Sequence, residues 1–206
     1  MKNLIIFLLI LIPNISWADQ FSPYIYITNV EKQHNRQYSG VVYASDENNY
    51  YVLTCWHGTS GLEERYINLH SNVIGQDSKI ALIAFKSTII KSDEDKDLSV
   101  LSFPKVDMVT IDPLYIAREQ PDPGTEMIGY GYSSVPTLIA NPIRVKSYGE
   151  YSSQQGSPLL EFAGQPISGM SGGPATLNNM IYGIQSAGNN RVLYCPSSEI
   201  LKFLGN

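Results

Sequence analysis

Residues 168–174 read Ser168-Gly169-Met170-Ser171-Gly172-Gly173-Pro174, a serine set among glycines. A serine hydroxyl is a poor nucleophile at neutral pH, so catalysis needs an adjacent base and N–H donors for the charge on the attacked carbonyl. Glycines suit the second task because, without a Cβ atom, they adopt backbone angles closed to other residues. The stretch predicts a nucleophile at Ser171 and an oxyanion hole formed by the amides of Gly169 and Ser171. The same composition is typical of a surface turn, so partners elsewhere must decide.

Candidate partners for Ser171 occur in the first half of the chain. His57 follows the strand-like run Tyr50 to Thr54, whose end offers a fixed place for an imidazole. A lone histidine at a strand end is more often structural than catalytic. Asp97 ends an acidic run and directly precedes the apolar run Leu98 to Leu101, so we expect its side chain to point inward. A carboxylate there would fix the imidazole tautomer and stabilise its cation.

Composition bounds the class of protein. The chain has 206 residues, of which 43% are hydrophobic and 11% aromatic, enough to bury a real core. Its formal charge of −5, with no cluster of Lys and Arg, argues against nucleic acid as a partner. A calcium loop from Asp93 would place Leu98 where a glycine is needed and Pro104 where a glutamate is needed. Zinc motifs are equally missing, so we expect no metal and no cofactor.

The N-terminus has the three parts of a secretory signal. Lys2 supplies the basic start, Leu4 to Ile12 the apolar core, and Ser16 and Ala18 the small residues before a cleavage site. We therefore expect residues 1–18 to be removed and the mature protein to be secreted or periplasmic, away from the membrane. The apolar run is too short for an ordinary membrane span, although an uncleaved anchor is the alternative.

The rest of the chain reads as short strands separated by turn residues. The clearest helix is the last, where Ser197 is a candidate N-cap and Gly205 a terminator. Pro113 to Gln120 and the turn Pro121 to Gly124 look like a link between two units. Many short strands with almost no helix predict an all-β sandwich or barrel pair. The strands that we expect are 41–43, 50–54, 66–69, 80–85, 98–103, 126–130, 143–148, 159–162, 180–186 and 191–195.

Taken together, these pieces resemble the trypsin-like (chymotrypsin-fold) serine peptidases. The order His57, Asp97, Ser171 is the order of this family, whereas subtilisins and α/β-hydrolases order the same groups differently. The pattern is closest to bacterial HtrA-like and glutamyl-endopeptidase-like members, and no PDZ domain follows. The resemblance covers about residue 38 to the C-terminus and rests on four ordered stretches, Tyr51 to His57, Asp97 to Leu101, Gly169 to Pro174 and Ile181 to Gly188.

The resemblance implies two packed six-stranded antiparallel β-barrels, in residues 19–115 and 116–206, with the site in the cleft between them. It implies a serine endopeptidase in which His57 is the base, Asp97 orients it and Ser171 attacks the peptide bond. Ser186 matches the serine that supports the aspartate. A catalytically degenerate binding module, and an esterase or effector with the same triad, are the alternatives. The oligomeric state is left open.

Two further expectations follow from the resemblance. The walls of the substrate side-chain pocket would include Gln165, Ser168, Gln185, Ser186 and Gly188. No aspartate stands where a trypsin has one, and Gln185 stands where glutamyl endopeptidases carry a histidine, so a neutral residue is the expected preference.

The two cysteines admit either a disulfide or two buried free thiols, because spacing gives no distance between them. The resemblance would bring the strand of Cys195 behind the segment of the catalytic histidine. It therefore favours a Cys55–Cys195 bridge.

Overall fold

The computed structural model describes residues 20–30, 35–61, 64–69, 83–107, 109–133, 137–152, 156–186 and 190–205. In these residues nearly all regular structure is β, and the helices are short, so the predicted all-β class is confirmed. None of their helices is long and apolar enough to cross a membrane. The predicted signal peptide, residues 1–18, lies outside the described residues.

The first half of the chain forms a seven-stranded antiparallel sheet. Its strand order is β6-β5-β2-β3-β4-β8-β7. Side chains of a strand point alternately to its two faces, and in β2 Ile25, Ile27 and Asn29 form a face that is 0% exposed, whereas Tyr24 and Thr28 on the other face are partly exposed. The strands are β2 (Tyr24–Val30), β3 (Asn35–Ser45), β4 (Asn49–Thr54), β5 (Glu64–Leu69), β6 (Ile83–Lys86), β7 (Thr88–Asp93) and β8 (Leu98–Pro104).

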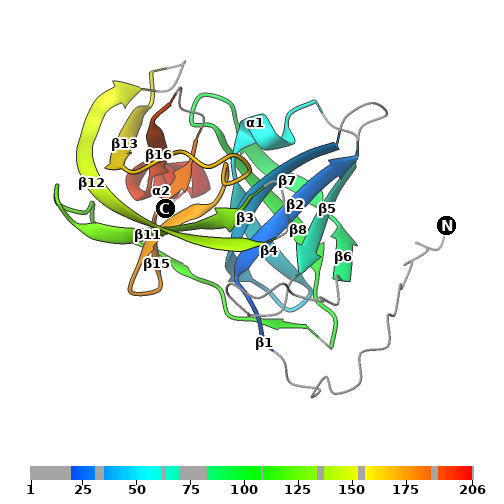
Figure 1. Ribbon diagram of the computed structural model, residues 1–206. Helices are drawn as coiled ribbons and strands as arrows, with labels where there is room; N and C mark the ends of the chain where they lie inside the picture. The colour runs from blue at the N-terminus through cyan, green and yellow to red at the C-terminus, as the bar shows by residue number, and fades with distance from the viewer. Residues whose placement is uncertain are drawn as a thin grey trace.

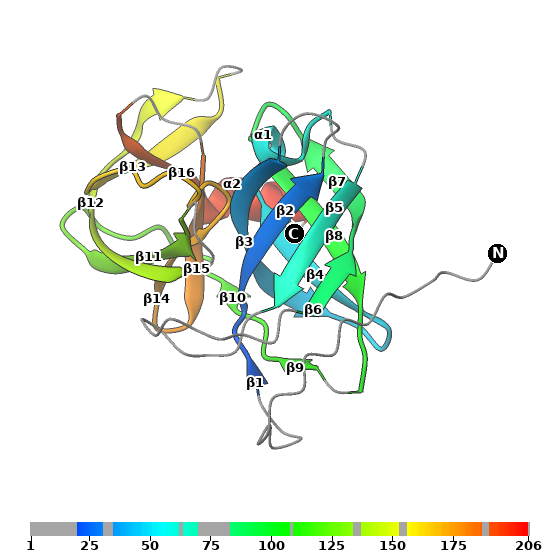
Figure 2. The same cartoon turned by 45° about the vertical axis from the view of Figure 1, so that its right-hand side comes forward.

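The second half forms a closed barrel. Its sheet order is β10-β15-β14-β11-β12-β13-β16, and β15 also pairs with β16, which closes a six-stranded ring and leaves β10 outside it. Figures 1 and 2 show this barrel beside the first sheet. The strands are β10 (Tyr115–Ile116), β11 (Glu126–Tyr132), β12 (Leu138–Ser152), β13 (Pro158–Ala163), β14 (Pro174–Leu177), β15 (Met180–Gln185) and β16 (Val192–Pro196).

The predicted fold class is confirmed, and the two halves differ in closure: the second is a closed six-stranded barrel, and the first is a half-barrel sheet. In the described residues the first sheet has seven strands, and its edge strands β6 and β7 are not paired with each other. Only Ser87 joins these two strands, which is shorter than the two-residue loop that a hairpin needs. The chain thus bends at Ser87, whose N–H donates to Arg65 O at 2.9 Å, so that β6 pairs with β5 at one end of the sheet and β7 pairs with β8 at the other.

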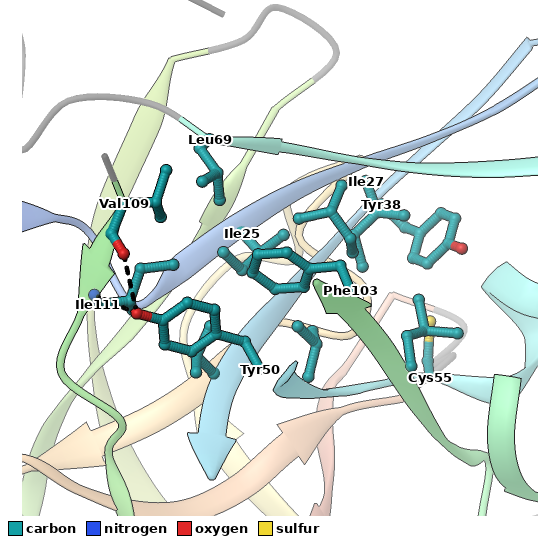
Figure 3. Packing of buried hydrophobic residues seen from close by; sticks show 13 residues of the cluster. Ile25, Ile27, Tyr38, Tyr50, Cys55, Leu69, Phe103, Val109 and Ile111 are labelled. Atoms are coloured by element: carbon teal, nitrogen blue, oxygen red, sulfur yellow. Dashed lines mark hydrogen bonds between the residues drawn. The ribbon is translucent and has the colours of Figure 1, made fainter. Parts of the chain in front are cut away.

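Three apolar clusters form the core, and one of them joins the two halves. The first lies inside the first sheet, where the Tyr50 hydroxyl donates to Val109 O at 3.1 Å and accepts from the Ile111 N–H at 3.1 Å (Figure 3). The third fills the second barrel. The second cluster joins the halves, because it contains Val41, Leu53, Leu98, Val100 and Leu114 together with Ile181, Ile184, Cys195, Ile200 and Phe203.

Short segments complete the connection between the halves. Strand β1 (Gln20–Phe21) pairs with β9 (Thr110–Ile111), and β10 pairs in parallel with β15. Helix α2 (Ser197–Leu204) ends at Gly205, whose φ of 91° is left-handed, as predicted. The predicted cap is wrong by one residue: the N-cap is Pro196, and the buried Ser197 hydroxyl instead accepts from Gln120 Nε2 at 3.4 Å. The helix packs its apolar face into the cluster between the halves.

Candidate active site

His57 and Asp97 lie in direct contact. His57 is the second residue of the short helix α1 (Trp56–Thr59), directly after β4, and Asp97 ends the turn before β8. Nδ1 of His57 lies 2.8 Å from Oδ2 and 3.0 Å from Oδ1 of Asp97, and the His57 backbone N–H donates to Oδ1 at 2.8 Å. Asp97 has a φ of 53°, a left-handed angle that costs energy for a residue with a Cβ atom. The turn therefore holds the Asp97 backbone in an unusual conformation that places its carboxylate beside the imidazole.

The Asp97 carboxylate sets the tautomer of His57. An ionised carboxylate only accepts hydrogen bonds, so the proton of the neutral ring must sit on Nδ1. Nε2 is then the ring nitrogen without a proton, as a general base requires. The Ser186 hydroxyl donates to Asp97 Oδ2 at 2.6 Å, which leaves this carboxylate held by three donor groups.

The contact changes the pKa of both groups. Burial alone would lower the pKa of His57, but its hydrogen bonds with Asp97 and Cys55 outweigh that effect and raise the pKa above its ordinary 6.5. Burial would likewise raise the pKa of Asp97, but the hydrogen bond and charge of His57, with the Ser186 hydroxyl, hold it below its ordinary 3.8. The pair is therefore most stable as an imidazolium beside a carboxylate.

The loop of Ser171 is shaped by glycines at left-handed angles. Gly169 has a φ of 91° and Gly172 a φ of 82°. A Cβ atom on Gly172 would lie 2.2 Å from Ser39 O, and one on Gly169 would lie 2.6 Å from Tyr132 O. Among the described residues, the N–H groups of Gly169 and Ser171 donate no hydrogen bond, so both are free to bind an anion.

Ser39 of β3 ties this loop to the first half of the chain, a role that the sequence did not suggest. Its N–H donates to Ser171 O at 2.7 Å, and its hydroxyl donates to Gly169 O at 2.9 Å while accepting from the Tyr132 N–H at 2.8 Å. A buried serine next to Gly40 in an otherwise apolar strand is a weak signal that only the assembled fold explains.

The remaining predicted site residues fall into three groups. Gln185 and Ser186 are buried directly behind the loop, where Gly172 N–H donates to Gln185 O at 2.8 Å. Gln165 and Ser168 are exposed, in the segment that leads to Ser171. Gly188 lies outside the described residues. Met170, between the two oxyanion candidates, is buried and packs against Gly131.

The structure does not show the predicted Cys55–Cys195 disulfide. Both Cys55 and Cys195 are free and buried in the structure. They belong to different apolar clusters, Cys55 to that of the first sheet and Cys195 to that between the halves. Cys55 Sγ instead lies 3.7 Å from His57 Nε2, and the described residues contain no hydrogen bond between Nε2 and Ser171 Oγ.

No group of three or more His, Cys, Asp or Glu side chains in the described parts of the chain is arranged to hold a metal ion. The chemistry that the arrangement supports is proton transfer at His57 Nε2 and the binding of an anion by the free amides of Gly169 and Ser171.

Comparison with known proteins identifies the family. Residues 38–179 match the model of the trypsin-like peptidase domain, and this range contains His57, Asp97 and Ser171. The chain belongs to this family. The predicted resemblance and the predicted enzyme class, a trypsin-like serine endopeptidase, are confirmed at that level. No curated protein matches the chain by sequence.

Solved structures of other proteases share the trypsin-like fold of the chain. The Rv3671c protease of M. tuberculosis in its active form is 18% identical, with a TM-score of 0.72 over 89% of this chain and 79% of that chain. A serine endoprotease from Yersinia pestis is 18% identical, with a TM-score of 0.68 over 94% and 66%. The HtrA-type protease AlgW, with a tripeptide, is 17% identical, with a TM-score of 0.71 over 92% and 62%.

Proposed function

We propose that this protein is a secreted serine endopeptidase in which Ser171 is the nucleophile, His57 the general base and Asp97 the residue that orients the base. The observation that carries the proposal is the pair of contacts, at 2.8 and 3.0 Å, between His57 Nδ1 and the Asp97 carboxylate. They leave Nε2 as the acceptor in a chain whose family cleaves peptides with such an imidazole.

The proposed reaction has two stages. Nε2 of His57 takes the proton of Ser171 Oγ while Oγ bonds to the peptide carbonyl carbon, and the amides of Gly169 and Ser171 bind the resulting oxyanion. The protonated imidazole then gives its proton to the leaving amine, and an acyl-enzyme remains. Water, activated by the same Nε2, hydrolyses this ester and releases the acid. Before the first step, the contact of His57 Nε2 with the Cys55 thiol is replaced by a hydrogen bond from the Ser171 hydroxyl. Catalytic hydrogen bonds commonly shorten in this way when the substrate binds.

A fluorophosphonate probe tests the nucleophile. The protein should be labelled at Ser171, and Ser171→Ala should lose labelling and nearly all peptide turnover while its circular dichroism stays unchanged. The residual rate should be about a thousand- to ten-thousandfold above that in water, from the oxyanion hole and binding alone. Labelling at another residue would overturn the assignment.

Probe labelling and turnover assays on the same protein distinguish the two alternative functions. A degenerate binding module would take no label, and an esterase would turn over simple esters but no peptide.

Export is the other part of the proposal. The arrangement of residues 1–18 supports a cleaved signal and a mature chain that begins at Asp19, in the periplasm or outside the cell. Intact mass of protein taken from the periplasm and from the medium tests the cleavage: a mass that retains residues 1–18 would favour the uncleaved anchor.

We also propose that the boundary between the two halves lies between residues 115 and 116.

A further inference from the structure

Gln185 lies directly behind the proposed nucleophile. It is the last residue of β15, and its backbone makes two hydrogen bonds with the loop: Gly172 N–H donates to Gln185 O, and Gln185 N–H donates to Gly173 O, both at 2.8 Å. These bonds fix the Gln185 backbone against the two residues that follow Ser171. A polar residue is therefore anchored next to the loop of the proposed nucleophile.

The alternation of β15 turns this side chain into the second barrel. Ile184 belongs to the apolar cluster between the halves, and the hydroxyl of Ser186 reaches Asp97, so both neighbours face the first half. Successive side chains of a strand point to opposite faces. Gln185 consequently faces the barrel interior, beside its register partner Tyr194 of β16.

Tyr194 fixes which way the amide points. Its hydroxyl donates to Gln185 Oε1 at 3.2 Å, and its ring packs edge-on against Phe162 with centroids 5.0 Å apart. Burial raises the pKa of Tyr194, so the hydroxyl keeps the proton that it donates. The carbonyl oxygen of the amide thus accepts a hydrogen bond from Tyr194, and the NH₂ group remains available as a donor.

The NH₂ end has no partner in the described part of the protein. Nε2 of Gln185 donates no hydrogen bond there, although the residue is only 7% exposed. This NH₂ group is not among the fully buried side-chain atoms without a partner, so it stays open to solvent. A donor that is open to solvent, with its carbonyl end fixed by Tyr194, can bond to an acceptor that the substrate brings.

We propose that Gln185 Nε2 selects substrates whose side chain before the cleaved bond carries a carbonyl acceptor, with glutamine preferred; this inference rests on the proposed endopeptidase function. The neighbouring cluster is apolar, so a glutamate carboxylate would lose its water without meeting a cation there. A methionine of similar length fills the same space but leaves the donor unpaired, and sites built around a hydrogen bond discriminate strongly against such analogues.

The experiment measures kcat/KM of the mature protein on a peptide series that varies only this position, with Gln, Glu, Met and Leu. Peptides with Gln should exceed those with Met by about ten- to a hundredfold. In Gln185→Met, which removes the amide at similar volume, the ratio of Gln to Met should fall close to one. A ratio measured within one variant cancels any overall loss of activity or of folded protein.

Tyr194→Phe provides a second variant, because it keeps Gln185 and removes only the hydroxyl that orients the amide. Its Gln to Met ratio should fall between those of the wild type and Gln185→Met. Tyr182→Phe is the matched control: it removes a hydroxyl from a side chain packed against the same cluster, and it should leave the ratio unchanged.

Two results overturn the inference while leaving the proposed function standing. A flat profile, or a preference for Glu over Gln, in protein that a fluorophosphonate labels at Ser171 would show that the amide does not select the substrate. An unchanged ratio in both Gln185→Met and Tyr194→Phe would show the same. Loss of labelling in the wild type would instead refute the proposed function itself.

Discussion

The two halves of the molecule build their parts of the site in different ways. In the first half, His57 and Asp97 are held by hydrogen bonds to one carboxylate, two from His57 and one from the Ser186 hydroxyl of the second half. The second half, a closed barrel, holds Ser171 through backbone hydrogen bonds and glycines at left-handed angles. The proton-transfer groups thus depend on electrostatics, whereas the nucleophile depends on backbone shape. Substitutions in the two halves should fail for different reasons.

Removing the charge in the first half should have the largest effect. Asp97→Asn keeps the shape but lets the side-chain amide donate to His57 Nδ1, which favours the wrong tautomer. We expect kcat to fall by about ten-thousandfold. Steady-state kinetics on one peptide measures this. Glu94→Gln, an exposed change in the same turn, is the control and should leave kcat unaltered. A fall of less than about tenfold for Asp97→Asn would mean that the carboxylate does not set the tautomer.

A Cβ atom in the second half tests backbone shape. Gly172→Ala meets Ser39 O at 2.2 Å and also forces a side chain onto a φ of 82°. Gly124→Ala is the matched control, because Gly124 has a φ of 91° but nothing within 4 Å of its Cβ position. The control should lose about 1–2 kcal/mol in urea unfolding, the cost of the angle alone.

Gly172→Ala should lose more stability than this control and most of its activity. Equal losses in the two variants would show that the approach of Ser39 is not tight.

The pH dependence should separate the activity of the first half from its stability. The base must be neutral, so kcat/KM should rise with pH through the raised pKa of His57, with a midpoint above 6.5. The raised pKa of His57 contributes fully to the stability of the fold below pH 6.5, and this contribution is lost as the pH rises through the folded-state pKa. The lowered pKa of Asp97 contributes to stability above about pH 3.8, and this contribution is lost as the pH falls through the folded-state pKa.

The stability advantage of the wild type over His57→Gln should therefore be greatest between pH 3.8 and 6.5, where activity is low. Thermal melts of both proteins across this range measure it. A rate that stays flat between about pH 5 and 8 would exclude His57 as the base.

The cysteines should give the smallest effect. Because Cys55 and Cys195 are free and lie in separate clusters, intact mass after denaturation and alkylation should show two modified thiols. A reductant should leave the melting temperature unchanged. A mass two hydrogens short, with a melting temperature that falls on reduction, would restore the bridge that the resemblance favoured and add about 2–4 kcal/mol of stability.

Local sequence patterns were enough to predict much of this fold. The alternation in Tyr50 to Thr54 and the turn before Leu98 are local features, so the strands and the positions of His57 and Asp97 followed from neighbouring residues. The bend of the chain at Ser87 and the placement of Cys55 and Cys195 in different apolar clusters depend on long-range packing, which no local pattern encodes. The prediction of Ser197 as the N-cap was wrong because the preceding residue, Pro196, ends the strand and is itself the N-cap.

The site showed the same limit. The types and order of its three proposed catalytic residues were visible in the sequence, and their roles are a proposal on which the geometry now bears. The Gln185 amide was assigned to the pocket, but its direction depends on the Tyr194 hydroxyl across two paired strands. A contact of that kind becomes visible only when the register of β15 against β16 is known.

The three hydrogen bonds of Ser39 have a consequence for the order in which the molecule is assembled. They supply first-half partners to Gly169, Ser171 and Tyr132, so the loop takes its final shape only after the two halves have docked. In a chain that is still folding, or whose two halves have separated on heating, every residue of the site is present but the Ser171 loop lacks its final conformation. Such a chain is itself an easy target for proteolysis, yet it does not digest its neighbours.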